Sequence, residues 1–286
     1  IELAGVKMSY KSLEVSIENH IAHVKLNRPD ALNSMNVDFW KEFPVAIRAI
    51  DASSEARVIV LSSTGKHFSA GMDLAVFTTS NSIPMQGDPS RMAENLRRAV
   101  LELQDAFNCL EGIRIPVLAA IHGGCIGGAV DMVSACDSRY CTEDTFFTIK
   151  ETQLGMTADL GTLQRLPHLI SQGLVRELAY TGRNMDAQEA KEAGLVNKVF
   201  ASHEAMLASV MDVAKMIAAQ SPVAVAGCKE MINYSRDHSV ADSLKYMATW
   251  QSGMFRPQDM MKCFAAKAQK ATPEFDPLLP VKKLFS

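Results

Sequence analysis

The stretch HGGCIGGAVDMVSACD, residues 122–137, sets two glycine pairs into an apolar segment and places one carboxylate, Asp131, in its middle. The apolar run VLAAI precedes it and an apolar run follows Gly127, so the stretch predicts a strand, a glycine turn and a buried helix. Backbone N–H groups at a helix start are unpaired and lie at the positive end of the helix dipole. Because glycine also lets a ligand approach the backbone, this turn is a candidate binding site.

A second turn of the same design, SAGMDL (residues 69–74), follows the strand-like run RVIVLSS and leads into a predicted helix start. Two N–H groups that converge from two such turns can hold a developing oxyanion. Either turn alone is also explained by ordinary turn chemistry. The pair together indicates a site.

The rest of the chain predicts an α/β fold with a helical end. LEVSIENHIAHVKLN alternates apolar and polar residues on both sides of a turn, as a hairpin does, and strands then alternate with helices up to about Val199. Beyond that point only amphipathic helices are predicted. We therefore expect a core over residues 1–199 and a helical segment over residues 200–286 that packs on the core or on another subunit.

Composition excludes several classes of protein. The 286 residues carry a formal charge of −3 and a pI near 6.2, which provide no broad basic field for nucleic acid. The six cysteines have no CxxC spacing, so we expect neither disulfides nor a zinc site. The long apolar run from Pro116 to Cys136 contains His122 and Asp131, and we expect no membrane insertion.

Five ordered motifs resemble the enoyl-CoA hydratase/isomerase (crotonase) superfamily. They are LNRPDALNSMN, GKHFSAGMDL, IHGGCIGGAVDMVSACD, FFTIKETQLGMTADLGTLQRLP and YTGRNMDAQEAKEAGLVNKV. The resemblance covers nearly the whole chain. It implies a crotonase-type spiral of ββα units with a C-terminal helical oligomerisation segment, assembled as a homotrimer or homohexamer.

The resemblance also implies a binding site for an acyl-CoA. In that family two backbone N–H groups hold the thioester carbonyl, and by motif position these belong to Met72 and Gly128. The segment around the thioester would be formed by Ala70, Gly71, Met72, Asp73 and Leu74. No cofactor and no metal are implied.

Three carboxylates separate the members of the superfamily. Hydratases carry glutamates at the positions of Asp131 and Glu151 and a small residue at that of Asp159. The set Asp131, Glu151 and Asp159 instead resembles the family members that convert 3,5-dienoyl-CoA to 2,4-dienoyl-CoA in β-oxidation, and this is the expected reaction.

Moving two conjugated double bonds requires the removal of a proton at C2 and the delivery of one at C6. We assign Glu151 as the base at C2 and Asp159 as the acid at C6, and the reverse assignment stays open. The pKa of Asp159 must then be raised, as burial beside other carboxylates would raise it. The three acids are expected to titrate as a coupled set, in which Asp131 tunes its neighbours or holds a group in place.

Each acid also has a simpler explanation. Asp131 lies in the first turns of a predicted helix, where the dipole favours a carboxylate. Asp159 could cap the helix that follows it. Glu151 stands beside Lys150 and could form a solvated ion pair.

Alternative activities are hydration of 2-enoyl-CoA, isomerisation of 3-enoyl-CoA to 2-enoyl-CoA, and, from another class, RNA binding by a non-catalytic relative. The missing basic helix face argues against RNA. The chain starts at Ile1, which suggests a removed presequence, and its end, KKLFS, is not the Ser-Lys-Leu peroxisomal signal. The expected compartment is therefore the mitochondrial matrix, with the peroxisome as the alternative.

Overall fold

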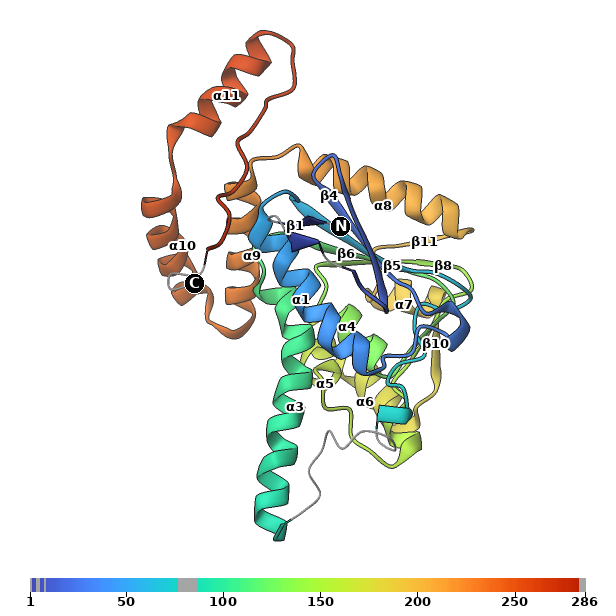
Figure 1. The fold of residues 1–286 in the computed structure, drawn as a ribbon. Coiled ribbons are helices and arrows are strands. Elements are labelled where there is room, and N and C mark those ends of the chain that lie inside the picture. Colours follow the sequence, from blue (N-terminus) through green and yellow to red (C-terminus); the bar gives the residue numbers. More distant parts are fainter. Residues whose placement is uncertain (1, 4–5, 8, 77–86, 283–286) are drawn as a thin grey trace.

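A parallel sheet forms the centre of the computed structural model, which describes residues 2–3, 6–7, 9–76 and 87–282 (Figure 1). Its strand order is β11-β8-β6-β5-β4-β3, and all neighbours are parallel except β3 and β4. The strands are β3 (Leu13–Glu18), β4 (Ile21–Leu26), β5 (Val58–Ser63), β6 (Val117–Ile121), β8 (Ser138–Thr142) and β11 (Lys198–Phe200). The predicted alternation of strands and helices is confirmed, because parallel neighbours require crossover connections.

The predicted hairpin is β3 and β4. Asn19 and His20 connect the two strands with φ values of 51° and 64°, the left-handed conformation that two-residue hairpin turns require. The register pairs Leu13 with Leu26 and Glu18 with Ile21. This hairpin forms one edge of the central sheet.

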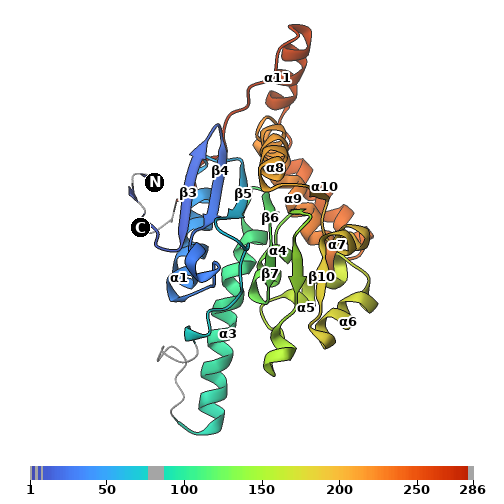
Figure 2. The same ribbon diagram turned by 90° about the vertical axis from the view of Figure 1, so that its right-hand side faces the viewer.

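A second, smaller sheet lies against the first and consists of β7 (Gly124–Ile126), β9 (Phe146–Thr148) and β10 (Asn184–Asp186) (Figure 2). Ser69 extends it through an isolated parallel bridge to Cys125. Successive turns of the chain thus place one strand in the central sheet and one in the small sheet, which is the predicted spiral. The candidate turns at residues 69–74 and 126–128 therefore become neighbours.

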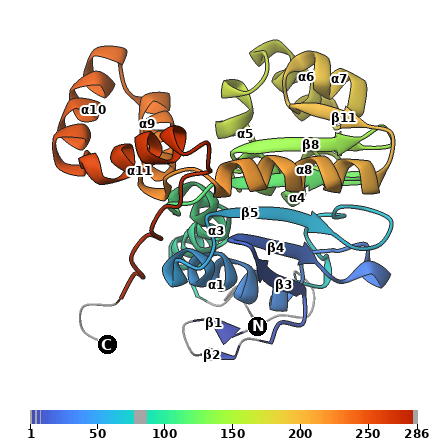
Figure 3. The same ribbon diagram turned by 90° about the horizontal axis from the view of Figure 1, so that it is seen from above.

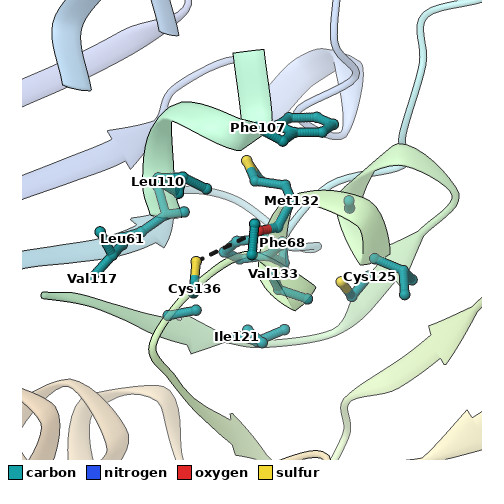
Figure 4. Close-up of a cluster of buried hydrophobic side chains, with 14 of the residues drawn as sticks. Leu61, Phe68, Phe107, Leu110, Val117, Ile121, Cys125, Met132, Val133 and Cys136 are labelled. Carbon is teal, nitrogen blue, oxygen red and sulfur yellow. Dashed lines mark hydrogen bonds between the residues drawn. The ribbon is translucent and has the colours of Figure 1, made fainter. Parts of the chain in front are cut away.

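Helix α4 (Gly128–Ser134) is the buried helix that the opening stretch predicts. Its Met132 and Val133 pack with Phe107 and Leu110 of α3 (Pro89–Gly112) and with Leu61 of β5, all within the main core (Figure 4). Helix α1 (Val37–Ser53) covers the same core, and the Asn36 side chain caps it by accepting the Phe39 N–H.

The other elements are short or lie around the rim of this core. They are β1 (Glu2–Leu3), β2 (Val6–Lys7), η1 (Pro29–Ala31), η2 (Glu151–Leu154), α5 (Thr162–Arg165), η3 (Leu166–His168), α6 (Gln172–Thr181) and α7 (Ala187–Ala193). Of these, η2 and α5 flank the segment that carries Asp159.

The segment over residues 200–286 is helical in its described part, as predicted, but its helices pack in different places. Helix α8 (His203–Ala218) packs Met206, Val210 and Ala214 onto the face of the central sheet opposite the main core (Figure 3). Helices α9 (Pro222–Asp237), α10 (Val240–Met254) and α11 (Pro257–Ala268) extend to one side (Figures 1 and 3). Within residues 200–286, α8 thus covers the sheet and only α9–α11 stand beyond it.

After α11 the chain returns to the sheet. Arg57 Nη2 donates to the carbonyl oxygen of Phe275 at 2.6 Å, Arg114 Nη1 donates to that of Leu279 at 3.0 Å, and the Val281 N–H donates to that of Ala52 at 2.9 Å. In the described part of the chain, no helix combines the length and the apolar character needed to span a bilayer.

Candidate active site

The two glycine turns meet at one end of the sheets. Met35 bridges Met72 in parallel, and Ser69 bridges Cys125, so both turns are held by backbone pairing. A Cβ on Gly71 would lie only 2.5 Å from the Ile126 carbonyl oxygen and 3.3 Å from the Gly128 nitrogen. Gly71, whose φ is +83°, is glycine because no side chain fits between the turns.

The amides of Met72 and Gly128 are left free for a ligand. A Cβ on Gly128 would lie 3.9 Å from the Met72 nitrogen, which shows how close the two groups stand. Gly128 is the first residue of α4, so its N–H has no acceptor within the helix. Among the described residues, neither N–H donates to a protein acceptor. Two preorganised donors in this arrangement can hold an oxyanion.

A cavity of about 490 Å³ opens beside these amides. Most of its wall is apolar, and two of its side chains, Glu151 and Asp159, are carboxylic acids. The lining residues are Ala70, Met72, Leu74, Leu96, Ala99, Val100, Leu103, Gly127, Gly128, Lys150, Glu151, Leu154, Met156, Thr157, Asp159 and Leu160. An elongated apolar ligand with one polar end suits such a wall.

Glu151 is the first residue of η2 and packs against the turn before α4. Its Oε1 lies 3.2 Å from the point that a Cβ on Gly127 would occupy, one residue from the Gly128 amide. Its Oε2 is buried and has no hydrogen-bond partner in the described chain. Lys150 donates to Gln153 instead of pairing with Glu151. The simpler explanation of Glu151 as half of an ion pair is therefore wrong.

Asp159 reaches the same cavity from the segment between η2 and α5, and it is exposed. We expected it to be buried, and in the single chain it is not, because the rim around it, which includes Leu154 and Met156, lies open at the surface. It is not the cap of α5 either, since Gly161 holds the N-cap position.

Asp131 lies behind the wall of the cavity. It is 1% exposed, and its Oδ1 accepts the Thr162 N–H at 2.6 Å while its Oδ2 is unpartnered in the described chain. The carboxylate therefore joins α4 to the start of α5, on the segment that carries Asp159. Asp131 does lie in the first turn of α4, as its simpler explanation requires, but that position does not explain the hydrogen bond from Thr162.

All three acids hold protons more tightly than free carboxylic acids do. Burial, together with the charges of Asp131 and Asp159, raises the pKa of Glu151 to about 7. Burial raises the pKa of Asp131 to about 6 against the opposing hydrogen bond from Thr162. Desolvation also raises the pKa of Asp159. The charge of Asp159 also raises the pKa of Asp131, so these charges act in the direction that the predicted coupled titration requires.

Two residues of the predicted thioester segment support the site from outside the cavity. Gly71 lets the turns meet, and Asp73 accepts the Ser34 hydroxyl at 3.1 Å and pairs with Arg28 at 3.4 Å. The sequence offers Arg28, Lys66 and Lys25 as candidates for contacts with CoA phosphates, and Lys25 pairs with Glu14. The sequence also predicts a polar loop over residues 78–90 that borders the acyl pocket, and residues 78–86 of this loop lie outside the described residues.

Three other side chains that could take part in chemistry form hydrogen bonds to the backbone instead. His67 Nδ1 accepts the Gly124 N–H at 2.9 Å, and His122 Nε2 lies 2.9 Å from the Gly65 carbonyl oxygen. Ser69 is buried and bonds to Asn33 O and Gly71 N. Where the structure describes the chain, no three His, Cys, Asp or Glu side chains gather as metal ligands would.

Sequence reasoning missed the wall that α3 provides. Leu96, Ala99, Val100 and Leu103 line the cavity, while Phe107 and Leu110 continue along α3 into the core. Their spacing of three and four residues was a signal that could have indicated this, because it marks one face of a helix. Sequence reasoning also missed the hydrogen bond from the Thr162 N–H to Asp131, because no residue pattern identifies a backbone amide as the partner of a side chain.

The matching family model is described as Enoyl-CoA hydratase/isomerase and covers residues 16–277. The chain belongs to the enoyl-CoA hydratase/isomerase family. The predicted resemblance is thereby confirmed. An enoyl-CoA hydratase/isomerase fold is also found in the crystal structure of an enoyl-CoA hydratase from Bacillus anthracis, with a TM-score of 0.83 and 30% identity over 93% of this chain and 99% of that one.

Several similar relatives share a more specific name. The mitochondrial Delta(3,5)-Delta(2,4)-dienoyl-CoA isomerase of Mus musculus is 47% identical over 92% of this chain and 81% of its own length. The peroxisomal Delta(3,5)-Delta(2,4)-dienoyl-CoA isomerase of Arabidopsis thaliana is 43% identical over 93% of this chain and 98% of its own.

Proposed function

We propose that this protein is an isomerase that converts 3,5-dienoyl-CoA to 2,4-dienoyl-CoA. One observation carries the proposal: two free amides, of Met72 and Gly128, stand at the wall of a cavity that two proton-holding acids, Glu151 and Asp159, also line. The relatives named dienoyl-CoA isomerase support the same reaction.

The thioester oxygen is held by the Met72 and Gly128 N–H groups. Charge that develops on this oxygen as C2 loses its proton meets dipoles already in place, and the loss of one such donor typically costs about 3 to 4 kcal/mol. Glu151 packs beside Gly127 and takes the proton from C2. The electrons shift along the conjugated tail, and Asp159 delivers a proton to C6. The reverse assignment of the two acids is kept as the alternative.

Asp131 adds to the proton affinity of Glu151. Its charge raises the pKa of Glu151, and its hydrogen bond to Thr162 fixes the start of α5. An acid in an apolar helix therefore serves the site without touching the substrate.

An absorbance assay tests the reaction. Purified protein mixed with a 3,5-dienoyl-CoA should produce the absorbance of a 2,4-dienoyl thioester. If no such chromophore forms and a 2-enoyl-CoA loses its absorbance instead, the protein is a hydratase and the proposal is wrong. RNA binding that survives Glu151→Gln and Asp159→Asn without any turnover would favour the non-catalytic alternative.

We further propose that α9–α11 within the helical segment 200–286 form a homotrimer, alone or paired into a hexamer. Large apolar side chains on these helices are exposed: Ile232, Val240, Leu244, Met261 and Phe264. Unpartnered apolar surface of this extent marks an interface. The mitochondrial matrix is the proposed compartment, with the peroxisome as the alternative that the plant relative's name supports.

A further inference from the structure

The carboxyl of Asp159 has no partner side chain in the described chain, so its place in the cavity depends on how its backbone is held. The segment from Asp159 to Gly161 turns sharply between η2 and α5, and Gly161 has a φ of +127°. Gln104 of α3 donates to the Asp159 carbonyl oxygen at 2.7 Å. The buried side chain of Arg165 also contacts this segment.

The guanidinium of Arg165 fills the space behind this turn. A Cβ on Gly161 would lie 1.8 Å from Arg165 Nη1, so the absent side chain is where the guanidinium sits. Nη1 donates to the Leu160 carbonyl oxygen at 3.3 Å, and the Arg165 N–H donates to that of Gly161 at 2.9 Å. The cavity is thus lined by Asp159 and Leu160, and the guanidinium contacts Leu160 and Gly161, the next residues of the same turn.

Two helices hold this guanidinium in place. Nη2 donates to Glu111 Oε2 at 2.8 Å and to Asn108 Oδ1 at 2.6 Å, both on α3. Glu111 also pairs with Arg236 of α9. The Arg165 side chain is 9% exposed. Removal of one partner of a buried ion pair strongly destabilises a protein, because the other charge is left buried without a partner.

We propose that Arg165 is a positioning residue for Asp159, held by Glu111 so that the Asp159 carboxyl stays where C6 of the substrate lies. This inference rests on the proposed function, in which Asp159 is the acid. Arg165 does not line the cavity, so its effect on Asp159 passes through the backbone of residues 159–161, while its charge also lowers the pKa of Asp131. Glu151 stands on η2 and not in this turn, so proton removal at C2 should change far less than proton delivery at C6.

Proton removal at C2 and proton delivery at C6 use different acids, so the two steps can be measured separately. In deuterated buffer, the wild type should incorporate deuterium at C2 of 3,5-dienoyl-CoA and also form product. Arg165→Met should lower kcat for isomerisation by about 10- to 100-fold, since displacing a reacting group by about 1 Å can cost that much. Exchange at C2 and KM should stay within about threefold of wild type, as expected when only the second proton transfer is impaired.

Arg114→Met is the matched control, because Arg114 is also an arginine beside α3 that pairs with a carboxylate, that of Asp51, but does not contact the turn at residues 159–161. It should leave both rates unchanged. Arg165→Lys, which keeps the charge but loses the planar donors, should recover part of kcat and serves as the variant to measure if the methionine variant does not fold. Equal losses of C2 exchange and isomerisation, or no loss of either, would overturn the proposal.

A readout independent of turnover keeps this inference separate from the proposed function. Amide hydrogen exchange at Leu160, Gly161 and Thr162 should become faster in Arg165→Met and stay unchanged in Arg114→Met. If the wild type fails to isomerise any dienoyl-CoA, the proposed function fails, and the exchange at these amides still decides whether Arg165 holds the segment. Unchanged amide exchange would show that it does not.

Discussion

Asp159 is the residue whose role is tested most simply, because it lines the cavity and no other side chain pairs with it in the described chain. Asp159→Asn keeps the shape and removes the proton. We expect kcat to fall by about 10³-fold or more with KM nearly unchanged, since general acid catalysis is typically worth about 10²- to 10⁴-fold. Asp105→Asn, on the exposed surface of α3, is the control. Undiminished turnover would remove Asp159 from the proton path.

The pH dependence of the reaction should report Glu151. As the base, Glu151 must be ionised, so kcat/KM should rise with pH through about 7, the value to which burial raises its pKa. The charge of Asp131 contributes to that rise, so Asp131→Asn should move the rising limb to lower pH. An unmoved limb in the pH profile would show that the two acids are not coupled.

Asp131 should also lower the stability of the protein at neutral pH. Its pKa is raised from 3.8 to about 6 on folding, so the folded chain binds this proton more tightly than the unfolded chain. The stabilisation is present below 3.8 and is lost as the pH rises through about 6, which amounts to about 3 kcal/mol. Asp131→Asn keeps an oxygen for the Thr162 N–H. We expect urea unfolding at pH 8 to show a gain of up to about 3 kcal/mol that shrinks at pH 5.

At the scale of elements, the two turns must touch for the amides to converge. Gly71→Ala places a Cβ 2.5 Å from the Ile126 carbonyl oxygen, so the turns must separate. We expect kcat to fall by about 10²-fold or more, the cost of losing an oxyanion donor. Gly194→Ala is the control, because its φ of +89° is similar and its nearest contact is an ordinary 3.6 Å. If both variants lose kcat alike, backbone strain alone explains the loss.

The elements also show where sequence reasoning succeeds. The β3–β4 hairpin, the strand β5 and the helix α4 follow from apolar periodicity and turn chemistry, which are local. The exposure of Asp159 and the hydrogen bond between Asp131 and Thr162 depend on how distant segments pack, and no local pattern encodes them. The packing of α8 on the sheet depends in the same way on strands far away in the sequence.

For the whole molecule, the exposed apolar face of α9–α11 predicts an oligomer. Phe264→Asp should shift the mass measured by light scattering from trimer or hexamer toward monomer, because a buried charge opposes association. Tyr180→Asp, on the exposed surface of α6, is the control. A wild type that is already monomeric would contradict the proposed assembly.

The return of residues 275–281 to Arg57, Arg114 and Ala52 affects how the protein is made. Each parallel strand pairs with one already synthesised or soon to follow, so the spiral can build turn by turn as the ribosome releases it. The contacts of the returning segment become available only after α11 has been made. A nascent chain can therefore form its two glycine turns well before these bonds close over α1 and β5.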